Sequence, residues 1–272
     1  MMNWIRSGLN SALRQPFALV CLFVYELLWG FILYRYVSSL LTPLLHRYPG
    51  EGLPSGAGQL FYAESHFRLT KTDLIEPYLW TFAVLLALRM IVTPLLNAAV
   101  FYSLERRDLN AGYRFFRGIK ELGGIYFLYY AILTVLIAAP LPWLFGIVGS
   151  LYEAHFLSDR MLLALLPYAG GYLLYVFLLQ LLFMYVQFGR AAGVRMMPTL
   201  LCWLGNVHRV VLIALAVGVI ALLFGIVAAT VSYVWAGLAA LIIHQLYPLL
   251  RMLFKLWGIA SQHALWHDKA KA

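Results

Sequence analysis

Val210–Ala229 reads VVLIALAVGVIALLFGIVAA and carries no charged side chain in 20 residues. A helix needs about 20 apolar residues to cross the roughly 30 Å hydrocarbon core of a bilayer. Similar apolar runs recur along the chain, and 63% of the 272 residues are hydrophobic while only 11% are charged. A soluble domain is about 25% charged. The sequence therefore predicts a polytopic membrane protein whose apolar residues face lipid.

Hydropathy predicts six spans of this kind. They are expected at Phe17–Leu41, Tyr78–Phe101, Ile125–Val148, Leu162–Tyr185, Val210–Ala229 and Trp235–Trp257. Strands are not expected, because an open sheet edge leaves backbone groups unsatisfied in lipid. The predicted fold class is thus all-α, a bundle of six transmembrane helices. The whole chain forms one membrane domain, with an extracytoplasmic loop at 46–76 and a cytoplasmic tail at 258–272.

The orientation follows from the Lys and Arg residues near the span ends, which gather on the cytoplasmic side of membrane proteins. On one side the chain places Arg6, Arg14, Arg106, Arg107, Arg114, Arg117, Lys120, Arg190, Arg195, Arg209, Lys255, Lys269 and Lys271. The other side has only Arg47, Arg68, Lys71 and Arg160, diluted by acidic residues. We therefore expect both termini in the cytoplasm of a bacterium, with the protein in its inner membrane. The net charge of +9 reflects the basic residues on the cytoplasmic side. No nucleic acid partner is expected, because these residues do not line one groove together with aromatic side chains.

Three segments, here called elbow segments, precede the first, third and fifth spans. Asn3–Arg14, Tyr113–Lys120 and Met196–Leu204 each place apolar residues on one helical face and polar or basic residues beside them, as interfacial helices do. The pattern predicts three copies of an elbow helix plus a transmembrane hairpin. The alternative is that any cytoplasmic loop between hairpins is basic and half apolar. The residues expected to bind anionic lipid headgroups are Arg106, Arg107, Arg114, Arg117 and Lys120.

With its elbow segments and hairpins, the chain resembles the six-span membrane domain found ahead of some bacterial glycerophosphodiester phosphodiesterases and in related integral membrane proteins. The resemblance covers most of the chain and rests on architecture and hydropathy. The catalytic phosphodiesterase domain of that family has no counterpart in this sequence. The resemblance therefore implies an accessory membrane module and no activity.

Ionisable residues inside the predicted spans are the next signal, because a charge at the bilayer centre is costly unless it is paired or hydrated. Glu26 and Arg89 each lie about 14–16 Å into consecutive antiparallel spans, and His244 lies at a similar depth in the last one. One interpretation is a structural clamp in which Glu26 and Arg89 form an ion pair. The other is a centre that binds a proton or a substrate.

Small residues form a stripe along the fifth span. Ala214, Gly218, Ala221, Gly225 and Ala229 are spaced by four, three, four and four residues. Such a stripe lets another helix backbone approach closely. We expect it to pack within the bundle, with a dimer interface as the alternative.

The cysteine and histidine residues do not indicate a disulfide or a metal site. Cys21 and Cys202 both fall near cytoplasmic helix ends, where a disulfide is not expected. His263 and His267 are one helical turn apart and adjacent to Asp268, but in an exposed tail we expect them to be solvated rather than to bind a metal. No cofactor is predicted. The sequence contains none of the common motifs of metalloproteases, serine hydrolases or phosphate-binding loops.

The leading functional hypothesis is a non-enzymatic accessory or scaffold protein of the membrane. Its expected partners are the lipid bilayer, anionic lipids in particular, and other membrane proteins or a second copy of the chain. The alternative is a small-solute transporter, or a subunit of one, that uses the polar cluster of Glu26, Arg89 and His244. An intramembrane enzyme ranks third.

Overall fold

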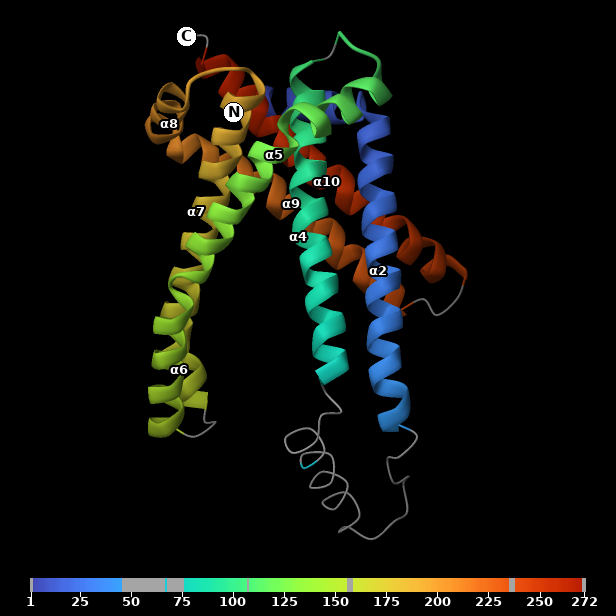
Figure 1. Ribbon diagram of the computed structural model, residues 1–272, viewed down its shortest axis with the longest axis vertical. Helices are drawn as coiled ribbons and strands as arrows, with labels where there is room; N and C mark the ends of the chain where they lie inside the picture. Colours follow the sequence, from blue (N-terminus) through green and yellow to red (C-terminus); the bar gives the residue numbers. More distant parts are fainter. Residues whose placement is uncertain are drawn as a thin grey trace. The chain divides into compact units, whose positions relative to one another are not determined.

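The computed structural model describes residues 2–45, 67, 76–106, 108–155, 159–234 and 238–270. Its helices are α1 (Met2–Leu13), α2 (Pro16–Leu45), α4 (Glu76–Glu105), α5 (Ala111–Ala138), α6 (Leu141–His155), α7 (Asp159–Ala191), α8 (Met196–Gly205), α9 (Val207–Val234) and α10 (Leu238–Ala270) (Figure 1). No strand occurs in this described part of the chain. The predicted all-α class is confirmed.

Five helical segments among the described residues are long and apolar enough to cross a membrane. They are Pro16–Thr42, Glu76–Glu105, Ala111–Tyr152, Leu163–Ala191 and Val207–Val234. The chain is thus a helical protein with the properties of a multi-pass membrane protein. The sixth predicted span, Trp235–Trp257, begins outside the described residues, and the six-span count is not confirmed. The loop predicted at 46–76 lies almost entirely outside them as well.

The chain divides into two compact units, Phe23–Thr93 and Met1–Leu22 with Pro94–Ala272. The smaller unit is a hairpin in which α2 and α4 run antiparallel, side by side (Figure 1). The Tyr36 hydroxyl donates to the backbone carbonyl of Tyr78 at 3.1 Å. Toward the other end of the hairpin, the hydroxyls of Tyr25 and Thr93 lie 3.3 Å apart. These contacts fix the register of the two helices.

In the larger unit, α5 and α6 form one arm that packs along α7 (Figure 1). Three tyrosine hydroxyls donate across this pair to backbone carbonyls, from Tyr126 to Gln187, from Tyr172 to Ile137 and from Tyr175 to Leu136, at 2.7, 3.0 and 3.0 Å. The pairs run in opposite directions along the two helices, so the packing is antiparallel.

The predicted third span, Ile125–Val148, is not one helix but covers the end of α5 and the start of α6. An elbow segment ending at Lys120 and a span beginning at Ile125 were predicted as separate elements, but α5 runs without interruption through Gly123 and Gly124 and breaks only at Ala139 and Pro140. A Cβ added at Gly123 would lie 2.8 Å from Cδ2 of Leu95, so this glycine permits close packing rather than a turn. The threefold repeat is therefore not confirmed.

The other two elbow segments are separate helices, as predicted. Helix α1 covers the first segment and α8 the third. Before α8, the chain leaves α7 through Gly193, whose φ of 74° is the left-handed conformation that glycine adopts readily. The amide of Val194 donates to the carbonyl of Gly189 at 2.8 Å, and the amide of Gly193 donates to that of Arg190 at 3.2 Å, which together form a Schellman cap.

The core of the larger unit gathers around Phe188 of α7. Its ring lies 4.9 Å from that of Phe101, 5.7 Å from that of Tyr185 and 6.1 Å from that of Trp266, measured between ring centroids. All four side chains are buried. Trp266 belongs to the end of α10, which is therefore part of the core.

The segment 258–272, expected to be an exposed tail, is helical through Ala270 and partly buried in its described residues. Residues 258–270 continue α10, and Ala260, Ser261, Gln262 and His263 are all buried. Helix α1 packs along this part of α10. Ser261, Gln262 and His263 looked solvated in the sequence, but neighbouring helices cover them. His267 and Asp268 are exposed, as expected.

Candidate functional site

A buried chain of hydrogen bonds joins α7, α10 and α9 inside the larger unit. The Tyr185 hydroxyl donates to Oε1 of Gln262 at 2.9 Å, and Nε2 of Gln262 donates to the carbonyl of Val210 at 2.8 Å. Gln262 is only 1% exposed, and the other two residues are fully buried. A buried polar group without a partner costs about 1–3 kcal/mol. These bonds therefore fix the register of α10 against α9 and α7.

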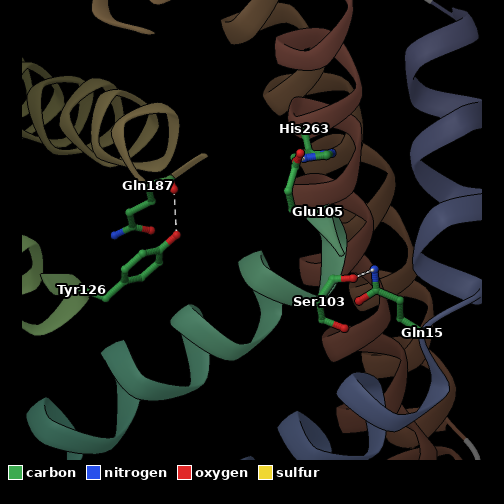
Figure 2. Close-up of polar contacts among 6 residues, drawn as sticks. All are labelled: Gln15, Ser103, Glu105, Tyr126, Gln187 and His263. Carbon is green, nitrogen blue, oxygen red and sulfur yellow. Dashed lines mark hydrogen bonds and ion pairs between the residues drawn. The ribbon is translucent and has the colours of Figure 1, made fainter. Parts of the chain in front are cut away.

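The last turn of α4 is tied to α10 by a second polar contact. Nε2 of His263 lies 2.9 Å from Oε2 of Glu105 (Figure 2). The His263 ring also packs edge-on against Phe188, 5.2 Å away between ring centroids. On the same turn of α4, the carbonyl of Ser103 accepts a hydrogen bond from Nε2 of Gln15 at 3.5 Å (Figure 2). The end of α4 is thus held from two sides.

A polar cleft of about 670 Å³ opens beside the contact between Glu105 and His263. Its lining includes Trp4, Glu105, Asp108, His263, His267 and Asp268. The His263 and His267 rings lie 6.2 Å apart. No group of three or more His, Cys, Asp or Glu side chains among the described residues could hold a metal ion. Carboxylate and imidazole side chains thus share the lining of this cleft.

A second hollow, here called the α7/α9/α10 groove, has a volume of about 440 Å³. Phe177, Met184 and Phe254 give it apolar walls, while Gln180, Arg251 and Lys255 bring polar and cationic groups to the same surface. No acidic residue occurs among its described lining residues. An apolar groove with two cations is complementary to an amphiphile that carries a negative charge.

The predicted packing stripe forms part of this groove. Ala214, Gly218 and Ala221 line it, and a Cβ added at Gly218 would meet no atom within 4 Å. Further along α9, Gly225 lies against the Tyr247 hydroxyl, and Ala229 is exposed. The buried face of α9 is instead made by Val210, Ile213 and Val217. The stripe thus leaves open space at Gly218 and packs against α10 at Gly225.

The positions of Arg251 and Lys255 follow from the antiparallel register of α9 and α10. Gln262 bonds to Val210, Gly258 contacts Val217, and Tyr247 contacts Gly225. Arg251 and Lys255 consequently lie opposite the middle of α9. In the sequence, Lys255 counted only as a topology signal, and Arg251 lies in the second half of the predicted span Trp235–Trp257. Their spacing of four residues, which places both on one face of α10, could have revealed them as a pair.

The predicted midplane cluster is only partly within the described structure. Glu26 and Arg89 are both half-buried on the facing helices of the smaller unit. The Arg89 guanidinium lies 5.2 Å from the centroid of the Trp29 ring. None of the ion pairs between described residues joins Glu26 to Arg89. The His244 side chain lies outside the described residues.

The basic residues expected at the lipid surface occupy different environments. Arg106 and Lys120 are exposed, and Arg107 lies outside the described residues. Arg117 is exposed but pairs with Glu121. Arg114 is only 7% exposed and belongs to the packed part of α5 rather than to the surface. The alternation of apolar and basic residues in the sequence did not reveal this burial.

Comparisons with known proteins assign no family to the chain. No family model, curated protein or solved structure matches it. Both cysteines are free, as expected. The fold alone therefore defines the class, which is a helical protein with five segments fit to cross a membrane.

Proposed function

We propose that the protein is a non-enzymatic accessory or scaffold component of a membrane and that it acts by binding anionic lipid. The observation that carries this proposal is the α7/α9/α10 groove, where Arg251 and Lys255 stand among apolar side chains. A phospholipid offers the matching groups, because its acyl chains suit the apolar walls and its phosphate suits the two cations.

Surface properties of the interfacial helices support a role close to lipid. Helix α8 exposes Met197, Leu201 and Leu204, each more than 60%. Large apolar side chains on a short helix at the end of a spanning helix are typical of a segment that lies in the membrane interface. Lys120 is exposed on α5, where its charge would favour anionic headgroups.

Lipid analysis of the purified protein tests this function. The protein is extracted in mild detergent, and bound lipid is identified by mass spectrometry. We expect anionic phospholipid to remain bound to the parent and to be depleted in the Arg251→Gln, Lys255→Gln double variant. The matched control is Arg195→Gln with Arg190→Gln, which removes two basic residues outside the groove lining. Recovery of a monomer without bound lipid or any partner protein would contradict the proposal.

The proposed topology places six spans in the bacterial inner membrane with both termini in the cytoplasm. It is supported by the asymmetry of Lys and Arg along the chain. In a variant without the native cysteines, cysteine introduced at Ser55 should react with an impermeant thiol reagent on spheroplasts with an intact inner membrane. Cysteine introduced at Lys120 should react only after lysis. The opposite labelling pattern would invert the topology.

A further inference from the structure

We propose that the smaller unit binds a transmembrane helix of another membrane protein, one that carries a basic side chain near its middle. The site is the Glu26 face, defined here as Glu26, Gly30 and Val37 of α2. The inference goes beyond the proposed lipid binding, because it concerns a different unit and a protein partner. It begins from a carboxylate that has no partner within its own hairpin.

Glu26 lies well inside the apolar part of α2. This helix begins at Pro16, and the segment Pro16–Thr42 is long and apolar enough to cross a membrane. Ten residues separate Pro16 from Glu26, which is about 15 Å along the helix axis and half of the roughly 30 Å hydrocarbon core. A charged side chain at that depth is costly unless it is paired or hydrated. When α2 spans the bilayer, Glu26 therefore requires a polar neighbour.

The hairpin itself does not provide that neighbour. Within the described ranges of the chain, no hydrogen bond or ion pair reaches Glu26. The Arg89 guanidinium lies over the Trp29 ring instead. Arg35 is nine residues further along α2, so it lies about 14 Å away on the opposite side of the helix. Neither of these two cations is paired with Glu26.

The contacts between α2 and α4 show which way the Glu26 face points. Three residues of α2 contact α4, and they are Tyr25, Trp29 and Tyr36. Glu26, Gly30 and Val37 each follow one of these by a single residue. They therefore lie about 100° further around the helix, on one shared face that does not point at α4.

The shape of this face suits a second helix. Gly30 is one turn beyond Glu26, and a Cβ added there would meet no atom within 4 Å. Val37, further along the face, is 45% exposed. A small residue between larger ones lets another helix backbone approach closely. A helix that packs at Gly30 brings its own side chains to Glu26 and removes the carboxylate from lipid.

Charge complementarity identifies the side chain that this partner helix must carry. An arginine donates two parallel hydrogen bonds to a carboxylate and neutralises its charge, and a lysine supplies the charge alone. An acidic side chain at the same depth would be repelled. A phospholipid does not fit either, because Glu26 repels its phosphate. The matching partner is thus a transmembrane helix with an arginine or a lysine near its middle.

The experiment uses the full chain in phosphatidylcholine vesicles, together with a synthetic transmembrane peptide of leucine residues that has one arginine at its centre. Binding is measured by energy transfer from the tryptophans of the protein to a dansyl group on the peptide, as the peptide-to-lipid ratio is raised. The comparison peptide has leucine in place of the arginine. We expect half-maximal transfer for the arginine peptide at a ratio about tenfold lower. Glu26→Gln should abolish this difference.

Three further variants test the geometry of the face. Gly30→Leu fills the open position and should weaken binding of the arginine peptide, as Glu26→Gln does without added bulk. Gly146→Leu fills an equally open glycine position of α6, outside the smaller unit, and should bind like the parent. Arg35→Gln removes a charge from the opposite side of α2 and should also bind like the parent. Circular dichroism and gel filtration show whether each variant is folded.

Three results would overturn the inference. The first is equal transfer to the arginine and leucine peptides with the parent protein. The second is a preference for arginine that survives Glu26→Gln. The third is a preference for a peptide with a central glutamate, which would assign the site to Arg89. Lipid retention by the Arg251→Gln, Lys255→Gln protein is measured separately, so this inference and the proposed lipid binding fail independently.

Discussion

The indole Nε1 of Trp257 donates a hydrogen bond of 2.8 Å to the backbone carbonyl of Ile5, although 252 residues separate them. The bond joins α10 to α1, the first helix of the chain. One turn further along the same pair of helices, Gly8 packs directly on the backbone of Ser261. The first helix is therefore a structural part of the larger unit and more than a surface anchor.

The close approach at Gly8 leads to a stability prediction. A Cβ at this position would lie 2.6 Å from both the backbone nitrogen and Cα of Ser261. Because those atoms belong to a helix backbone, α1 must move away to accept Gly8→Ala. We expect a loss of about 1–3 kcal/mol, as in other overpacked cores, measured as a lower thermal midpoint in detergent. Gly124→Ala, where a Cβ meets no atom within 4 Å, should not be destabilised.

The bond between Tyr185 and Gln262 gives a second prediction. Tyr185→Phe removes the hydroxyl and leaves Oε1 of Gln262 without its donor at a site that is 1% exposed. We expect a cost of about 1–3 kcal/mol, together with faster proteolysis of α10 by an added protease. Tyr233→Phe removes the same atom from a side chain that is 91% exposed and should be neutral. Equal melting of the two variants would show that this bond does not fix the register of α10.

Much of the fold could be predicted because lipid leaves the backbone few choices. Long apolar runs must become helices, since their amides and carbonyls have no water to bond. Helix α1 at Met2–Leu13 and α8 at Met196–Gly205 match two predicted elbow segments within a few residues. Their amphipathic pattern is local, so it was visible in the sequence.

Contacts between residues that are far apart in the sequence could not be predicted, because no local pattern indicates them. Glu105 and His263 are 158 residues apart, and neither position has neighbours in the sequence that indicate the other. The end of α10 contains enough polar residues to look solvated, but α1 packs on it at Gly8, and α7 and α9 bond to it through Tyr185 and Val210. Hydropathy also records that Arg251 and Lys255 are charged without showing that they face the same groove.

The smaller unit gives a prediction about Arg89. Its guanidinium lies over the Trp29 ring at 5.2 Å, so we expect this pair rather than Glu26 and Arg89 to be energetically coupled. In double-mutant cycles by thermal unfolding, Arg89→Gln and Trp29→Leu should couple by about 0.5–2 kcal/mol. The cycle of Arg89→Gln with Glu26→Gln should be nearly additive. If Glu26→Gln instead restores the stability lost in Arg89→Gln, the two charges form an ion pair in the membrane, as the sequence first suggested.

Cys202 on α8 provides a pH-dependent prediction. Burial raises the pKa of the Cys202 thiol above its ordinary value, while the positive charge of Lys269 acts more weakly in the opposite direction. The thiolate is the reactive form, and a raised pKa means that less of it is present at any pH below that pKa. In a Cys21→Ser background, alkylation by a maleimide should therefore reach half of its limiting rate at a higher pH for Cys202 than for a reference cysteine.

The reference is Leu204→Cys with Cys202→Ser, on the same helix at a site that is 61% exposed. Restricted access lowers the limiting rate without moving the midpoint, so the two effects of burial separate in the pH profile. A midpoint below that of the reference would mean that Lys269 outweighs burial at this thiol.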